Sequence, residues 1–243
     1  MISLLLFAIL GASIGSFIGV IVDNNYKIPK ISKRSECKSC NKKLSPLMMI
    51  PILSFVYLRG KCNFCKSKIP FRLLIIEIIS LIGFLIIFSS GFTILNKIIL
   101  SLIFIVNLII SIHDKQMLAV KNSDIILNII LCCILALSLN GEVNILAACC
   151  GFLLFYTVYI LSKKKGVGIG DAYLLFAYGL VLNIESTILC FFLSFWIACI
   201  YLIMQVLTFG IKNLQKAIPL APFLSLSFFI SLKYGKFLIQ LII

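Results

Sequence analysis

Charged residues are scarce in this chain. They make up 12% of its 243 residues, whereas 62% are hydrophobic. An average soluble domain has about 25% charged residues. This composition excludes an ordinary water-soluble domain and predicts an integral membrane protein.

Apolar runs close to the ~20 residues needed to cross a bilayer recur along the chain. We therefore expect an all-α polytopic membrane protein with about eight transmembrane helices. The sixth run is short, and the eighth is interrupted by Lys233 and Lys236. The first lacks the basic flank and the small-residue cleavage site of a signal peptide, so we interpret it as a helix. The expected spans are 1–22, 71–90, 93–112, 124–139, 143–161, 171–183, 187–209 and 218–243.

Basic residues are concentrated in one segment, because 12 of the 22 lie between residues 23 and 72. The positive-inside rule places this segment in the cytoplasm. Eight spans then leave 19 of the 22 inside, the exceptions being Lys97, Lys233 and Lys236. Topology thus explains the net charge of +14, and we expect the lipid bilayer, and no nucleic acid, as a partner.

Four of the ten cysteines form two C-x-x-C hooks, Cys37/Cys40 and Cys62/Cys65, separated by 21 residues. Two such hooks have the spacing of a tetrahedral zinc site. Disulfides are the alternative, but a cytoplasmic loop keeps its thiols reduced. We expect structural zinc, and we interpret the other six cysteines as small buried hydrophobic residues.

Acids are the scarcest charged class, with eight in all. Loops or turns explain Asp23, Glu36, Glu142 and Glu185, and Asp124 suits the first turn of a helix. The residues that stand at the cytoplasmic edge of expected spans are Asp114 and Asp171. An ionisable residue at membrane depth is a functional candidate by default.

Two carboxylates within hydrogen-bonding reach do not both ionise easily, so one keeps a proton while the other stays charged. That arrangement suits an aspartyl protease, in which the charged member activates water and the protonated member donates to the developing oxyanion. Gly168 and Gly170 before Asp171 would allow a sharp turn and a close approach of substrate. A helix cap is the alternative role of Asp171.

The stretch "GIGD" (Gly168 to Asp171) resembles the G-x-G-D signature of membrane aspartyl proteases. Nearly the whole chain is similar to one branch, the bacterial type IV prepilin peptidases. The residues that carry the resemblance are "GASIGSFIGVIV" (11–22), the two hooks with "IPILSFVYLRGKC" between them, "CKSKIPFRLLIIEIIS", Asp114 and "IPLAPFL" (218–224). The resemblance aligns Glu77 with an acid common in that family, without giving it a role.

The resemblance implies cleavage of the basic leader of type IV prepilins or pseudopilins, after a glycine, on the cytoplasmic side of the bacterial inner membrane. It implies Asp114 and Asp171 as the catalytic pair. Many members also methylate the new N-terminus with S-adenosylmethionine. The implied division is a first helix (1–22), a cytoplasmic four-cysteine loop domain (23–70) and a membrane peptidase core (71–243).

Two departures from the family pattern stand out. Lys121 occupies the place of a proline after Asp114, which we expect to alter the loop, and Gly19 replaces an asparagine in the first span. The second departure bears on methylation more than on cleavage, and the sequence has no glycine-rich nucleotide-binding unit. His113 adjoins Asp114, but helix neighbours point about 100° apart, so we expect an interfacial role.

Two other interpretations remain open at this stage. One is a membrane zinc-binding scaffold or transporter with aspartates along an ion path, which Glu77 alone favours. The other is a G-x-G-D protease that cuts transmembrane helices within the bilayer, for which the four cysteines would be unnecessary.

Overall fold

The computed structural model describes residues 2–23, 35–163, 166–210 and 218–242. Within these ranges the chain is helical, and its β pairing is limited to two isolated bridges, Glu36 with Lys43 and Lys61 with Lys68. The all-α prediction is therefore confirmed. Basic residues of the predicted orientation that lie outside the described ranges are Lys27, Lys30, Lys33, Arg34, Lys164, Lys165, Lys212 and Lys216.

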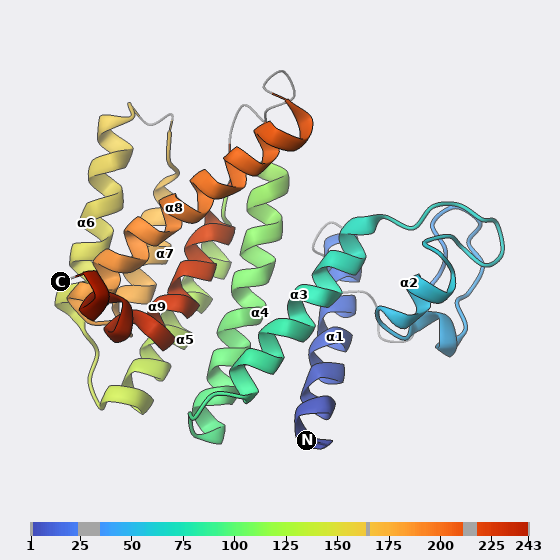
Figure 1. Cartoon of the computed structure of the whole chain (residues 1–243), viewed down its shortest axis with the longest axis horizontal. Helices are drawn as coiled ribbons and strands as arrows, with labels where there is room; N and C mark the ends of the chain where they lie inside the picture. Colours follow the sequence, from blue (N-terminus) through green and yellow to red (C-terminus); the bar gives the residue numbers. More distant parts are fainter. Residues whose placement is uncertain (1, 24–34, 164–165, 211–217, 243) are drawn as a thin grey trace. The chain divides into compact units, whose positions relative to one another are not determined.

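The helices divide into two compact units, Met1–Thr93 and Ile94–Ile243. The first unit contains α1 (Ile2–Asp23), a 3-10 turn η1 (Pro46–Met49), the short α2 (Leu53–Tyr57) and α3 (Phe71–Phe88). The second contains α4 (Ile94–Met117), α5 (Asn122–Asn140), α6 (Ile145–Leu161), α7 (Ile169–Gly179), α8 (Ile184–Phe209) and α9 (Ala221–Ile242) (Figure 1).

Each of the eight predicted spans corresponds to one α-helix. The remaining α-helix, α2, lies within the four-cysteine segment and not in a predicted span. Six of these helices are long and apolar enough to cross a membrane, namely α1, α3, α4, α5, α8 and α9. At 17 residues α6 falls just short, and α7 has only 11. The chain is thus a multi-pass membrane protein with fewer full-length spans than predicted.

Close packing of α1 against α3 dominates the first unit. Gly11, Gly15 and Gly19 recur every four residues, so they lie along one stripe of α1. A Cβ at Gly15 would stand 2.7 Å from the Ser80 hydroxyl, and one at Gly19 would stand 2.8 Å from a Leu73 methyl. Small residues at such a stripe let two membrane helices approach closely. The predicted division at residue 70 therefore falls inside a compact unit and stays a prediction.

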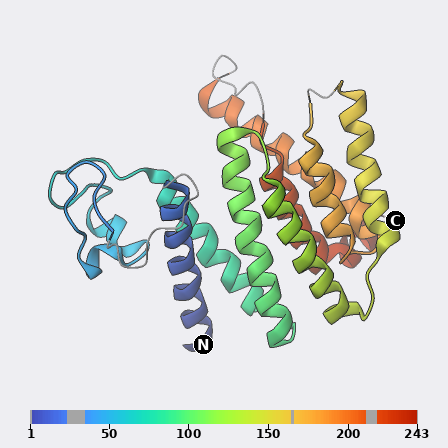
Figure 2. The same cartoon turned by 180° about the vertical axis from the view of Figure 1, so that it is seen from behind.

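The short helix α7 is the centre of the second unit, where it packs against α5, α6, α8 and α9. Seven of its 11 residues are buried, and Figure 2 shows the second unit from behind. Gly179 lies so close to α6 that a Cβ would stand 2.6 Å from the Ala148 backbone. Because other helices surround α7, it does not have to be long enough to cross the hydrocarbon core by itself.

The cysteines of the membrane helices are only partly as predicted. Cys132 and Cys190 are fully buried, but Cys149 and Cys199 are exposed on α6 and α8. Exposure of these two cysteines is compatible with a membrane helix, because lipid tails accept a small apolar side chain as readily as the protein interior does.

Candidate active site

Asp114 lies in the last turn of α4, with 7% of its surface exposed. Its Oδ2 accepts a hydrogen bond of 3.1 Å from the backbone N–H of Ala221, which is the first residue of α9. A helix N-terminus carries partial positive charge and stabilises a carboxylate there. The start of α9 therefore fixes the position of this side chain, a contact that the sequence did not predict.

Asp171 is the third residue of α7 and is also 7% exposed. Its Oδ2 accepts a 3.2 Å hydrogen bond from the backbone N–H of Gly168, which closes a cap at the start of the helix. The capping role weighed against catalysis is thus present. The two carboxylates lie close enough for the charge of Asp114 to act on Asp171. The cap uses only Oδ2 of Asp171, so it does not exclude a further role for Oδ1.

The two glycines of the motif differ in their surroundings. Neither has a left-handed backbone, and Gly168 has φ −79°, so a sharp turn is not the reason for them. A Cβ on Gly170 would stand 3.3 Å from the Val120 side chain, whereas one on Gly168 would meet only ordinary contacts. Gly170 therefore allows the segment after α4 to approach the start of α7.

Two hydrogen bonds connect the segment after Asp114 to the end of α4. The Leu118 N–H donates to the Asp114 carbonyl at 2.8 Å, and His113 Nδ1 donates to the Ala119 carbonyl at 2.7 Å. His113 is buried, and its bond to Ala119 helps to hold this connection. Lys121 has φ −75°, within the range that proline imposes, so this residue keeps the backbone angle that we expected to change.

A buried polar cluster lies beneath the two aspartates. The Tyr178 hydroxyl donates to Asn107 Oδ1 at 2.9 Å and lies 3.3 Å from the Ser225 hydroxyl. Asn128 Nδ2 also donates to Asn107 Oδ1. These four residues come from α4, α5, α7 and α9, and we call them the polar core. They were not predicted, although spacing held a signal: Asn107 precedes Asp114, and Tyr178 follows Asp171, by seven residues, or about two helical turns.

Other acids have separate environments. Asp124 is half-buried in the first turn of α5 and accepts a 3.0 Å hydrogen bond from Ser123, in agreement with the predicted helix start. Glu77 in α3 accepts a 2.7 Å hydrogen bond from the backbone N–H of Ile52. Within the described residues, the acids that are buried are Asp114 and Asp171.

The two cysteine hooks fold alike and bring their sulfurs together. In the first, Cys37 N–H donates to Lys42 O at 3.0 Å, and Asn41, with φ +55°, turns the chain. In the second, Cys62 N–H donates to Ser67 O at 2.8 Å, and Lys66 has φ +58°. All four sulfurs lie within 4.8 Å of one another.

The donor set fits zinc. A tetrahedron with Zn–S bonds of about 2.3 Å has edges of about 3.8 Å, and the Cys37 and Cys65 sulfurs are 3.8 Å apart. Backbone N–H groups of Ser39 and Cys40 lower the pKa of Cys37 to about 6. Cys40 receives the N–H of Lys42, but loss of water and its cysteine neighbours outweigh this contact and raise its pKa to about 11. The hooks thus present at least one thiolate near neutral pH.

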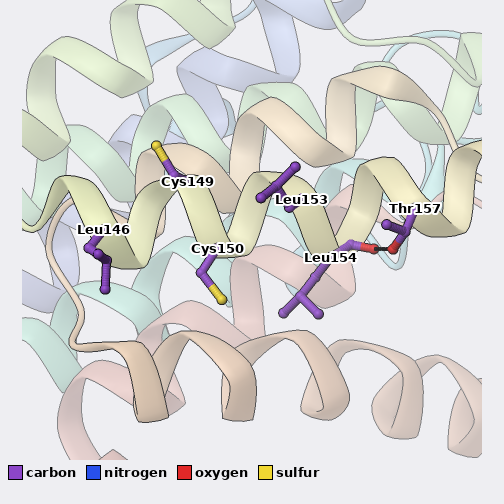
Figure 3. Close-up of a pocket in the computed structure, with 6 residues that line it drawn as sticks. All are labelled: Leu146, Cys149, Cys150, Leu153, Leu154 and Thr157. Carbon is purple, nitrogen blue, oxygen red and sulfur yellow. Dashed lines mark hydrogen bonds between the residues drawn. The ribbon is translucent and has the colours of Figure 1, made fainter.

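A groove is lined by residues of α6 alone, and neither Asp114 nor Asp171 is among them (Figure 3). It contains no acid, and its one marked internal hydrogen bond joins the Thr157 hydroxyl to the Leu154 carbonyl at 2.8 Å. We assign it no part in the site. Its lining consists of Leu146, Cys149, Cys150, Leu153, Leu154 and Thr157.

Comparison with known proteins agrees with this arrangement. Residues 9–90 match the bacterial peptidase A24 N-terminal domain, and residues 101–203 match the type IV leader peptidase family. A prepilin leader peptidase/N-methyltransferase of Bacillus subtilis is 31% identical over 86% of this chain and 85% of its own length. Proteins of the same name from Vibrio cholerae and Aeromonas salmonicida are 28% and 27% identical, over 82% and 83% of this chain and 85% and 72% of their own lengths. No solved structure matches the chain significantly. The chain belongs to the type IV leader peptidase family.

Proposed function

We propose that this protein is a prepilin leader peptidase that cuts the basic leader from type IV prepilins or pseudopilins, after a glycine. The observation that carries the proposal is the pair of buried carboxylates, Asp114 and Asp171, within electrostatic reach of each other at the ends of two helices. Membership of the family and the names of its relatives support the same activity.

The mechanism follows from the carboxylate pair. At the pH of the cytoplasm the pair holds one proton, because two close buried carboxylates repel each other's charge. The charged member takes a proton from water as the water oxygen attacks the scissile carbonyl. The protonated member donates its proton to the carbonyl oxygen, and the resulting intermediate collapses as the leaving amine is protonated.

The backbone contacts hold each carboxylate by one edge. Ala221 N–H binds Oδ2 of Asp114, and Gly168 N–H binds Oδ2 of Asp171. In the proposed mechanism the Oδ1 atoms share the proton and receive the water. The N-terminal start of α9 and the G-x-G-D turn act as the two supports of the catalytic pair.

We place the carboxylates on the cytoplasmic side of the bacterial inner membrane. The concentration of basic residues between 23 and 72 supports this orientation through the positive-inside rule. The leader of a prepilin lies on that side of the membrane as well.

Zinc is the ion that the four cysteines suit best. Cys37, Cys40, Cys62 and Cys65 would hold it in a closed tetrahedral site, where it would stabilise the segment without taking part in the reaction. Metal analysis of the purified protein and of Cys62→Ser tests this assignment. One zinc per chain that falls below half on substitution is expected, and a metal-free wild type would contradict it.

Methylation of the new N-terminus with S-adenosylmethionine is the second activity that the relatives' names support. Gly19, where the family has an asparagine, lies against Leu73 of α3 and leaves no side chain there for a ligand. We therefore propose cleavage as the principal activity and methylation as a separable one.

The test is co-expression with a prepilin, followed by mass spectrometry of the pilin N-terminus. Removal of the leader after its glycine is the expected result, and an added mass of one methyl group reports the second activity. An intact leader across several prepilins from the source organism would contradict the proposal.

A further inference from the structure

The segment between the two cysteine hooks exposes a large apolar surface. Leu47 of η1 and Leu53, Val56 and Tyr57 of α2 are 64 to 87% exposed. Leu53, Val56 and Tyr57 stand at positions i, i+3 and i+4, so they occupy one face of α2. We call these four residues the apolar face. An exposed surface of this kind, outside the membrane spans, marks an interaction site.

Two contacts tie this segment to the beginning of α3. The Ile52 N–H donates to Glu77 Oε2 at 2.7 Å, and the Phe55 ring meets the Phe71 ring edge-on at 6.1 Å between centroids. Ile52 has φ +62° at the N-terminal end of α2, an unfavourable backbone for a β-branched residue. The contact with Glu77 therefore holds the chain in a specific place.

The position of Glu77 gives the depth of the segment. With 18 residues, α3 is about 27 Å long, whereas the hydrocarbon core is about 30 Å thick, so its first residue Phe71 must lie near the membrane boundary. Glu77 follows six residues later, about 9 Å further along the helix axis. The Glu77 side chain leans back toward the start of the helix, so the Ile52 backbone bonded to it lies between the levels of Phe71 and Glu77, within about 9 Å of the membrane boundary.

The residues around the apolar face suit a lipid surface. Interfacial helices bury their apolar side about 5–10 Å into the boundary of headgroups and acyl chains, which matches the depth of Glu77. Tyr57 has the amphipathic ring that is enriched at this level. Lys42 and Lys43 precede η1, Arg59 and Lys61 follow α2, and no acid lies in residues 41–61 of the sequence. Such a segment attracts anionic lipid headgroups.

We propose that the η1–α2 segment lies in the membrane interface, with its apolar face immersed among anionic phospholipids and with Glu77 as its anchor on α3. The four-cysteine segment is then a membrane-attached element. This inference does not depend on the reaction that the two aspartates catalyse.

Tryptophan fluorescence of the full-length protein in phosphatidylglycerol-containing vesicles tests the proposal. The chain has a single tryptophan, Trp196, which is replaced in a Trp196→Phe background. Leu53→Trp and Val56→Trp then report on two positions of the apolar face. Asn63→Trp, at an exposed polar position within the second hook, is the matched control.

The expected result is quenching of both reporters by lipids that carry a spin label near the top of the acyl chain. Quenching by aqueous iodide should be at least roughly threefold weaker at residues 53 and 56 than at the control, because the interface excludes the ion. Two reporters guard against a local effect of one substitution.

Equal iodide quenching at all three positions, without quenching by the labelled lipid, would overturn the proposal. So would a reporter that is water-exposed in vesicles and becomes shielded only after a prepilin is added, because the apolar face would then bind substrate instead of lipid.

Discussion

Gly168 and Gly170 belong to one motif, yet at the scale of single residues their surroundings set different requirements. A Cβ at position 170 would press on Val120, at 3.3 Å, whereas a Cβ at position 168 finds ordinary contact distances. Packing against Val120 therefore requires a glycine at position 170. At position 168 the structure requires only the backbone N–H, which donates to Asp171.

Gly170→Ala is expected to lower cleavage several-fold, because overpacking by one methyl group costs about 1–3 kcal/mol and shifts the start of α7. Gly168→Ala keeps its N–H and should remain within about twofold of wild type by the same reasoning. Rates of prepilin cleavage by the purified variants provide the measurement.

Val120→Gly supplies the control for that pair. It removes both Cβ and Cγ2, the two Val120 atoms that the new methyl would meet at 3.3 Å, so Gly170→Ala with Val120→Gly should recover most of the lost rate. A double variant as slow as Gly170→Ala would mean that the glycine is needed for a reason other than this contact.

The cysteine hooks make a second prediction at the residue scale. The lowered pKa of Cys37, about 6, leaves it mostly thiolate at pH 7, whereas Cys40, with a pKa of about 11, stays protonated. In metal-free protein, iodoacetamide should therefore label Cys37 before Cys40. Labelling of Cys37 should slow as the pH falls through 6, because protonation removes the nucleophile.

Peptide mapping by mass spectrometry after timed labelling at pH 5 and pH 7 distinguishes the two cysteines. Added zinc should protect both, since a metal-bound sulfur is a poor nucleophile. Equal labelling of the two at pH 7 would contradict the asymmetry of the hooks.

At the scale of helices, the polar core joins the elements that carry the proposed catalytic pair. Tyr178 on α7 bonds to Asn107 on α4, each about two turns from its aspartate. Since α4 and α7 are otherwise connected through α5 and α9, this bond is a direct link between the two carboxylate-bearing helices. We infer that the polar core sets their relative position.

Tyr178→Phe keeps the ring, which stacks on Phe228 at 4.4 Å between centroids, and removes only the hydroxyl. We expect it to lower the free energy of unfolding by about 1 kcal/mol, in the range measured for hydrogen bonds within membranes. The cleavage kcat should fall while KM changes little, because the tyrosine positions the aspartates and does not touch substrate. Thermal unfolding in detergent and steady-state kinetics measure the two effects.

Phe104→Leu changes a half-buried ring contact between α4 and Phe229 of α9, so it serves as a comparison that loses packing without losing a hydrogen bond. If the Tyr178→Phe protein kept the wild-type kcat, the polar core would contribute to stability but not to the positions of the two aspartates.

The order and type of the helices could be predicted from the sequence, because each long apolar run must bury its backbone hydrogen bonds within one helix. The shortness of the sixth run was visible as well, but the burial of α7 among α5, α6, α8 and α9 was not, since an apolar run reads alike whether lipid or protein surrounds it. The pairing of α1 with α3 was also missed. The spacing of Gly11, Gly15 and Gly19 carried that information, but we interpreted these residues only as part of a family segment.

At the scale of the whole molecule, the candidate residues could be identified because acidic residues are scarce in this chain. A chain with eight acids and long apolar spans leaves few carboxylates to consider, and Asp114 and Asp171 are the two that the structure buries and brings into electrostatic reach. The backbone groups that hold these side chains could not be predicted, because every residue type except proline has an N–H like that of Ala221. The same limit hid the bond between Ile52 and Glu77.

The whole molecule thus combines a peptidase unit with a four-cysteine segment that we place at the membrane surface. Cleavage next to the membrane suits both, because a prepilin has its scissile bond between a basic leader and a hydrophobic segment. The proposed activity depends on the carboxylate pair.

The most direct measurement compares prepilin cleavage by purified wild type, Asp114→Asn and Asp171→Asn, with Asp124→Asn as the control. Asparagine preserves shape and removes the acid, and Asp124 is a half-buried acid at the start of α5, near the same connection. We predict a loss of at least roughly 10³-fold for each catalytic variant, because acid–base catalysis by either member fails, and a rate close to wild type for the control. Cleavage that persists in either Asp114→Asn or Asp171→Asn would contradict the two-aspartate mechanism.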